Sequence, residues 1–181
     1  MHPVRWALVA CLASVAAATT LREATTCDLV EGAERVCCAV CESVEARVDP
    51  RTGMVFTHAS FRLLEDLKGR GAGGATIRLR VVGGKVGNLA TIVEGMPAFR
   101  PAEERVLFLG RPNDAGFETL YFAGRGAIRV EADDRGARWI ADRVTGFREL
   151  DGARRIPLDE FREAVVREVR ALERRRAESG R

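Results

Sequence analysis

Apolar and polar side chains alternate along several short runs of this chain, and residues typical of turns separate the runs. The cleanest alternation is at residues 77–81, where aliphatic side chains alternate with two arginines. Two longer runs, residues 36–48 and 54–64, flank the segment 49–53, whose proline and glycine favour a tight bend. A period of two residues is typical of strands with one buried face. The pattern therefore predicts a β-hairpin followed by a third strand.

Further short runs follow at residues 88–94, 106–109, 117–122, 127–132 and 138–144. Glycine, proline, asparagine or aspartate stands between them, as in an antiparallel sandwich or barrel. Residues 106–109 are apolar at every position, which predicts the most buried strand. The expected fold class is mainly β, an OB-like closed or partly open antiparallel barrel with a C-terminal amphipathic helix.

The C-terminal pattern changes to helical spacing after Pro157. The apolar positions of this segment are Leu158, Phe161, Val165, Val169 and Leu172. Acidic residues stand in its first turn and arginines at its end, as the helix dipole favours. We expect this helix to cap the open end of the barrel. A membrane-surface helix is disfavoured because the polar face mixes glutamate with arginine.

The N-terminal residues 1–18 have the layout of a secretory signal peptide. A single charge, Arg5, precedes an apolar stretch that ends in three alanines. We therefore predict an exported protein, periplasmic or secreted, with a mature chain that starts near Thr19. Lipoprotein anchoring at Cys11 is the alternative. The predicted organisation is a signal peptide (1–18), an entry segment (19–35), a β-barrel domain (36–150) and a C-terminal helix and tail (151–181), with no membrane span.

The charge pattern does not indicate a nucleic-acid partner. The chain has 29 lysines and arginines against 26 aspartates and glutamates, for a net charge of +3. The two signs are interspersed, whereas a nucleic-acid footprint needs clustered cations. The expected partner is an unknown envelope or secreted protein, and the expected oligomeric state is a monomer.

Two glycine-rich loops raise the question of phosphate binding. Gly69, Gly71 and Gly74 match the spacing G-x-G-x-x-G, but a strand follows them where the dinucleotide fingerprint needs a helix. The loop at Gly83, Gly84 and Lys85 lacks the upstream glycine and the Ser or Thr of a P-loop. We expect both loops only to turn the chain.

Four cysteines follow the predicted signal peptide: Cys27, Cys37, Cys38 and Cys41. In an exported chain they are disulfide candidates with three possible connectivities. The expected bond joins Cys27 to one of the strand cysteines, and the other two remain buried thiols. A metal or redox site is the sharper alternative. However, a strand sends Cys37 and Cys41 to one face and Cys38 to the other, so we expect no metal site and no cofactor.

Catalytic candidates are few. His58 is the only histidine after the predicted signal peptide, and no hydrolase, zinc-protease or kinase motif occurs. We predict a non-enzymatic protein with no catalytic residues. The alternative is a small envelope hydrolase or a thiol-redox protein that uses His58 or the Cys37, Cys38 and Cys41 cluster.

The chain resembles a group of uncharacterised exported bacterial proteins. The resemblance rests on residues 40–58, which match V-x-S-V-E-x-R-x-D-x-x-T-G-x-V-F-T-H in looser form, and on four further motifs. These are the segments 67–69, 82–87, 95–99 and 104–109, and the helix opening at residues 158–161 completes the pattern. That layout is similar to the netrin-like, or tissue-inhibitor-of-metalloproteinases-like, OB barrel.

The resemblance implies a protein-interaction or protease-inhibitor-like domain. In the true inhibitors an N-terminal cysteine chelates the protease zinc, whereas Cys27 lies several residues beyond the predicted cleavage site, so this wedge does not carry over. The candidate surface is the turn 49–53 together with the loops 83–88 and 96–100. Its candidate binding residues are Gly83, Gly84, Lys85, Met96, Pro97 and Phe99.

Overall fold

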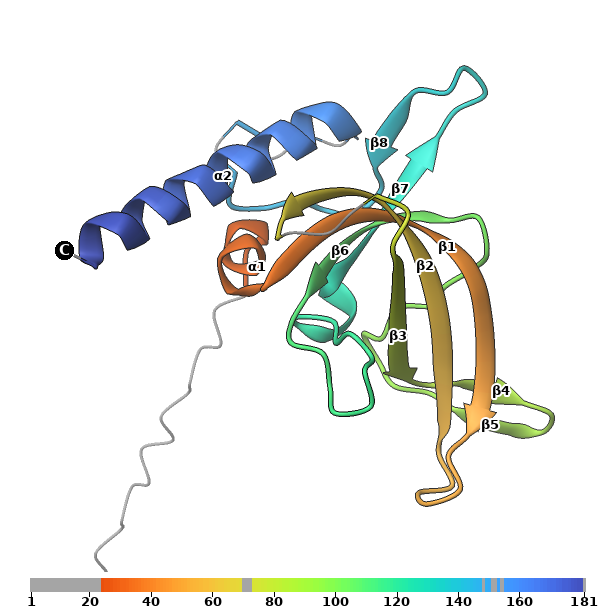
Figure 1. Ribbon diagram of the computed structural model, residues 1–181. Helices are drawn as coiled ribbons and strands as arrows, with labels where there is room; N and C mark the ends of the chain where they lie inside the picture. Colours follow the sequence, from red (N-terminus) through yellow and green to blue (C-terminus); the bar gives the residue numbers. More distant parts are fainter. Residues whose placement is uncertain (1–23, 70–72, 148, 151–152, 154, 181) are drawn as a thin grey trace, which may run out of the picture.

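The computed structural model describes residues 24–69, 73–147, 149–150, 153 and 155–180 (Figure 1). The predicted signal peptide and Cys11 lie outside the described residues. The elements in chain order are α1 (Thr26–Gly32), β1 (Arg35–Val48), β2 (Val55–Lys68), β3 (Thr76–Val82), β4 (Gly84–Val86), β5 (Leu89–Thr91), β6 (Glu104–Leu109), η1 (Ala123–Gly126), β7 (Ala127–Ala132), β8 (Arg138–Ile140), β9 (Ile156–Pro157) and α2 (Leu158–Ser179).

The long hairpin of β1 and β2 confirms the first prediction. Its turn forms because the Asp49 carboxylate accepts hydrogen bonds from the backbone N–H groups of Arg51 (2.9 Å) and Thr52 (3.1 Å). Gly53 completes the turn with a φ of 70°. The pairing of the two strands shifts register at three places between residues 36 and 43 of β1. Bulges of this kind bend a strand, and both strands curve strongly along their length (Figure 1).

The main sheet is antiparallel, with the strand order β3-β2-β1-β6-β7-β8-β9. It packs a separate core on each face. The inner core lies between β1, β2, β3 and β6, and includes Cys37, Phe61 and Leu79. The outer core lies between the opposite face and the two α-helices, and includes Cys38 and Phe161. Adjacent cysteines of β1 thus point to opposite faces, as the period of a strand requires.

Strand β6 separates the two cores. Leu107 and Leu109 contribute to the inner core, and Val106 and Phe108 contribute to the outer core. All four side chains are fully buried. The prediction that residues 106–109 form the most buried strand is therefore confirmed, because a strand apolar on both faces needs a cover on each side.

No closed barrel forms among the described strands. The predicted strand at residues 117–122 is absent, and this segment makes only two isolated bridges, Leu79 to Glu118 and Leu109 to Leu120. It ends in two consecutive left-handed residues, Phe122 (φ 62°) and Ala123 (φ 51°), which turn the chain into η1 and prevent a continuous strand. The predicted strand at residues 138–144 is also shorter than expected, since β8 ends at Ile140.

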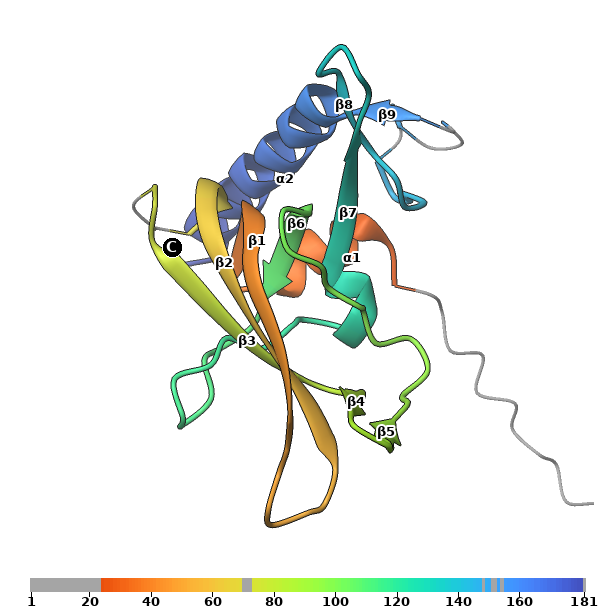
Figure 2. The ribbon, with the colours of Figure 1, turned by 90° about the vertical axis from the view of Figure 1, so that its right-hand side faces the viewer.

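Helix α2 confirms the predicted C-terminal helix, and its buried residues include all five predicted apolar positions. Its location differs from the prediction. It packs beside α1 on the outer face of the sheet, not over a barrel end (Figures 1 and 2). Within the described part of the chain, no helix is both long enough and apolar enough to span a bilayer.

Candidate functional site

Five of the six binding residues predicted from sequence line one surface groove. Gly83, Gly84 and Lys85 contribute from the start of the β4–β5 hairpin, and Met96 and Pro97 from the segment that follows it. The groove has a volume of about 410 Å³. The β4–β5 hairpin that borders it lies toward the end of the β1–β2 hairpin that is away from α2 (Figure 2). We call this surface the β4–β5 groove. Its lining residues are Thr57, Val81, Val82, Gly83, Gly84, Lys85, Ala90, Thr91, Ile92, Val93, Met96, Pro97 and Ala98.

Glycine geometry holds the β4–β5 hairpin on the inner face of β2. Gly84 has a φ of 133°, and a Cβ at this position would lie 2.8 Å from Thr57 Oγ1 and 3.2 Å from Val55 Cγ1. Gly83 donates its N–H to the carbonyl of Val55 (2.9 Å) and accepts a hydrogen bond from the Thr57 hydroxyl (2.7 Å). These glycines therefore allow a sharp turn and a close backbone approach that other residues would obstruct.

The predicted role of Phe99 as a binding residue is wrong. Phe99 is only 6% exposed and packs in the inner core, edge-to-face against Phe61 with 5.2 Å between ring centroids. The Arg105 guanidinium lies 5.5 Å from the Phe99 ring. Phe99 thus anchors the segment that carries Met96 and Pro97, because its large side chain gains more from burial than from exposure.

Aliphatic side chains are exposed around the β4–β5 groove. Ile92 is 91% exposed, Leu89 45%, Val93 38% and Val86 36%. A single exposed aliphatic residue is ordinary, but four stand here within eight residues. Ile92 and Val93 line the groove, and Val86 pairs with Leu89 on the adjoining hairpin. The sequence predicted a short strand at residues 88–94, but periodicity alone does not show what covers a strand.

Among the described residues that line the β4–β5 groove, only Lys85 is ionisable. No ion pair or hydrogen bond of its ammonium group is recorded with any described residue. The groove therefore combines aliphatic walls with one uncompensated positive charge.

His58 lies on the outer face of β2, away from this groove. Its ring packs edge-to-face against Phe117 with 5.3 Å between centroids. Burial lowers the pKa of His58, and the nearby cations Arg47 and Arg80 lower it further. Arg80 is held by an ion pair with Asp49 and stacks over Phe56 at 3.9 Å. His58 faces Glu45 across the β1–β2 pairing, but the Glu45 carboxylate accepts hydrogen bonds from Arg47, so it does not orient the imidazole as the carboxylate partner of a general base would.

The strand cysteines behave as core residues. Cys37, Cys38 and Cys41 are buried free thiols, so the expected disulfide between Cys27 and one of them is not formed. The Cys27 Sγ instead donates a hydrogen bond to the carbonyl of Gly146 (2.9 Å). Burial raises the pKa of Cys37 and Cys38 to about 12, which keeps both thiols protonated and poorly nucleophilic.

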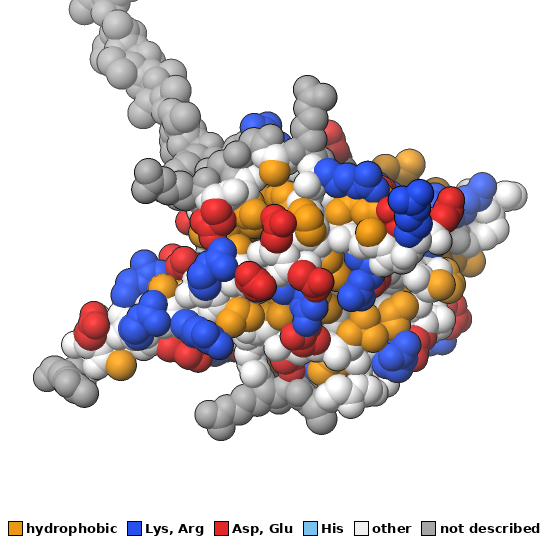
Figure 3. Space-filling view, turned by 90° about the horizontal axis from the view of Figure 1, so that it is seen from above, with side chains coloured by type: hydrophobic (Ala, Val, Ile, Leu, Met, Phe, Trp, Pro, Cys, Tyr) orange, Lys and Arg blue, Asp and Glu red, His pale blue; other side chains and the backbone are white. Residues whose placement is uncertain are grey.

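The described residues contain no cluster of three or more His, Cys, Asp or Glu side chains that could hold a metal ion. The face of the molecule that carries α2 shows cationic and acidic side chains intermixed (Figure 3).

No protein-family model, curated protein or solved structure matches this chain. The function is therefore inferred from the β4–β5 groove itself.

Proposed function

We propose that this protein is an exported, non-enzymatic binding module whose β4–β5 groove receives an apolar segment of an envelope or secreted protein. The observation that carries this proposal is the exposure of Ile92, Leu89 and Val93 beside a groove that no described element covers. Burying such side chains against a partner is favourable by about 25 cal/mol per Å² of apolar surface removed from water.

The partner segment also carries a carboxylate next to its apolar side chains. Lys85 supports this assignment, because it places one positive charge in an otherwise uncharged groove. A cation at the edge of an apolar contact contributes more to orientation and selectivity than to affinity. The segment thus binds with its apolar side chains between Ile92 and Met96 and its carboxylate near Lys85.

The finer fold assignment is part of the same proposal. We propose that the main sheet is a partly open OB-like barrel, with residues 118–121 taking the place of a closing strand between β3 and β6. The hydrogen bonds from Glu118 N to Arg78 O and from Tyr121 N to Phe108 O, both 2.8 Å, support this assignment. The β4–β5 groove then opens at one end of that barrel, where OB-like domains present their loops.

The test compares two matched aspartate substitutions in affinity capture from envelope and culture fractions. Ile92→Asp places a charge in the proposed contact, and Leu64→Asp places one on β2 at another exposed aliphatic residue (38% exposed). We expect a stoichiometric partner to be captured by the wild-type chain and by Leu64→Asp, and lost by Ile92→Asp. Circular dichroism of both variants checks that the fold is intact.

Lys85→Glu then tests the carboxylate on the captured partner. The expected result is at least a tenfold weaker affinity and a smaller dependence on salt, because a repulsive pair replaces an attractive one. Capture that is equal for Ile92→Asp and the wild-type chain would reject the groove as the binding site. A metalloprotease as the captured partner would support a protease-inhibitor-like role.

A further inference from the structure

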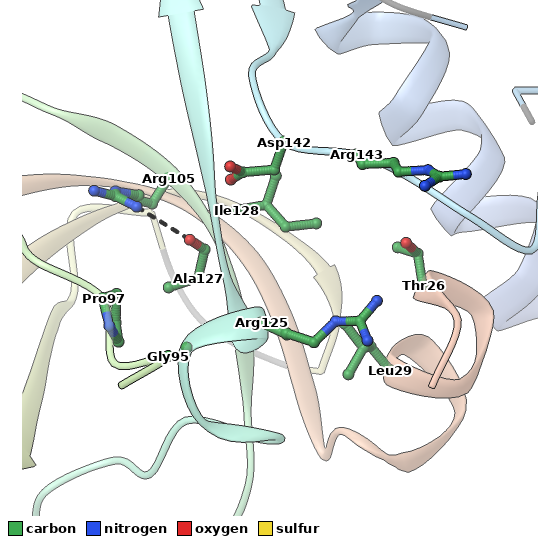
Figure 4. A pocket seen from close by; sticks show the side chains of 11 residues that line it. Thr26, Leu29, Gly95, Pro97, Arg105, Arg125, Ala127, Ile128, Asp142 and Arg143 are labelled. Atoms are coloured by element: carbon green, nitrogen blue, oxygen red, sulfur yellow. Dashed lines mark hydrogen bonds between the residues drawn. The ribbon is translucent and has the colours of Figure 1, made fainter. Parts of the chain in front are cut away.

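A second cavity, of about 320 Å³, lies on the other side of the segment that carries Pro97. Residues from α1, β6, η1, β7 and the chain after β8 line it (Figure 4). The cavity has no local signal in the sequence, because its residues come from five separate parts of the chain. We call it the η1 cavity.

The η1 cavity is rich in guanidinium groups. Arg105, Arg125 and Arg143 line it, against one lining carboxylate, Asp142. Asp142 already accepts a hydrogen bond from the backbone N–H of Arg129 (2.7 Å). Arg125 and Arg143 make no recorded ion pair within the described ranges, whereas many arginines elsewhere are paired. With Arg105 paired to Glu103, the remaining lining charges are those of Arg125, Arg143 and Asp142, which leave the cavity a net charge of +1.

Arg105 holds two walls of the cavity together. Its guanidinium donates to the carbonyls of Ala98 (2.8 Å) and Ala127 (3.1 Å) and pairs with Glu103 (2.7 Å). Arg105 is only 8% exposed, and its Nε is buried without a hydrogen-bond partner in the structure. A buried donor of this kind is costly unless an acceptor reaches it. Figure 4 places Arg105 beside Pro97, at the opposite end of the cavity from Thr26.

Arg125 and Arg143 lie at the Thr26 end, and apolar side chains lie between the two ends. Arg125 extends over Leu29, and Ile128 occupies the centre of the cavity (Figure 4). The cavity thus has guanidinium groups at both ends, Arg105 at one and Arg125 and Arg143 at the other, with apolar side chains between them. A ligand that fits one end and the middle has an anionic head and a short apolar body.

The backbone that presents Arg125 is strained and closely packed. The two left-handed residues before it, Phe122 and Ala123, adopt a conformation that is unfavourable for side chains other than glycine. Gly124 packs so closely that a Cβ there would overlap the carbonyl oxygen of Gly95. Strain of this kind persists where the surrounding structure imposes it, and here it sets the position of η1 at the cavity wall.

We propose that the η1 cavity binds a small organic carboxylate. The guanidinium groups of Arg125 and Arg143 contact the carboxylate, and Leu29 and Ile128 contact the apolar body. Arg is suited to this role because its planar donors match the geometry of a carboxylate. The volume lies at the lower end of the range for small-molecule sites, which fits a ligand the size of hexanoate or benzoate.

The test titrates the full chain with hexanoate, benzoate, acetate and inorganic phosphate, with NMR detection of the arginine Nε–H signals. Hexanoate and benzoate are expected to bind saturably and more tightly than acetate, because only they fill the apolar middle. Arg125→Met is expected to weaken hexanoate binding at least tenfold. Arg135→Met is the matched control, because Arg135 is exposed in the β7–β8 turn and its replacement removes the same charge.

Three outcomes would overturn the proposal. The first is the absence of saturation below about 10 mM ligand, which would mean a dissociation constant too weak for a specific site. The second is equal weakening by Arg125→Met and Arg135→Met, which would indicate a general charge effect. The third is phosphate binding as tight as hexanoate with the same dependence on Arg125, which would assign the cavity to inorganic anions. Arg143→Met provides a second variant if Arg125→Met fails to fold.

Discussion

Helix α2 and the β4–β5 hairpin both carry rows of aliphatic side chains, but the two regions differ in what covers them. On α2, Phe161 and Val165 are fully buried in the outer core. On the hairpin, Leu89 and Ile92 remain 45% and 91% exposed. Intramolecular packing accounts for the first row and leaves the second without a cover among the described residues, as the proposed binding role requires.

The largest expected effect on stability comes from truncating a buried side chain of α2. Phe161→Ala should lower the free energy of unfolding by about 3–5 kcal/mol, because it removes a ring packed edge-to-face on Phe147 and leaves a cavity. Ile92→Ala should change it by less than about 0.5 kcal/mol, because Ile92 has little packing to lose. Urea unfolding of both variants checks the contrast. Comparable losses would mean that Ile92 is packed in solution and is not available to a partner.

A smaller effect on stability is expected from disturbing the close packing of Gly84 of the β4–β5 hairpin against β2. Gly84→Ala should lower the free energy of unfolding by about 1–3 kcal/mol. A residue with a Cβ is strained at a φ of 133°, and the added methyl group would contact Thr57 Oγ1. Thermal unfolding measures the loss, and partner capture should weaken with it. Gly87→Ala is the control, because Gly87 also has a positive φ (57°) but has open space around its Cβ. An equal loss in both variants would show that strain alone, and not the close approach, matters.

The smallest expected effect is a pH dependence of stability caused by His58, which lies on neither α2 nor the β4–β5 hairpin. The pKa of His58 is lowered in the folded chain, so the unfolded chain binds the proton more strongly. Stability attributed to His58 is therefore present above its unfolded pKa of about 6.5 and decreases as the pH falls below that value. His58→Gln should flatten the decline in melting temperature between about pH 7 and pH 5. An unchanged slope would show that other groups cause the decline.

The hairpin, β3, β6 and α2 were predictable because each has a local signal. Alternation specifies one buried face, the turn at Asp49 and Gly53 has its own hydrogen bonds and a positive φ, and α2 has a continuous helical stripe. Five of the predicted binding residues lie along one groove, and their role in binding stays a prediction.

The wrong predictions concern residues whose environment depends on contacts with segments distant in the sequence. Phe99 looks like a loop residue, yet Phe61 and Arg105 bury it. The expected disulfide failed because the strand cysteines pack into the two cores while Cys27 bonds to Gly146. The segment 117–122 has the composition of a strand, but it makes only isolated bridges to β3 and β6.

The sequence by itself determined the local elements, since hydrophobic period, turn residues and helix-end charges act over a few residues. Only the tertiary structure decided which rows of apolar side chains are covered and which arginines line the same cavity. Packing places α2 against the outer core and leaves Ile92 exposed, and it brings Arg105, Arg125 and Arg143 to one cavity. These outcomes depend on contacts between segments far apart in the chain, and no local pattern of side chains encodes such contacts.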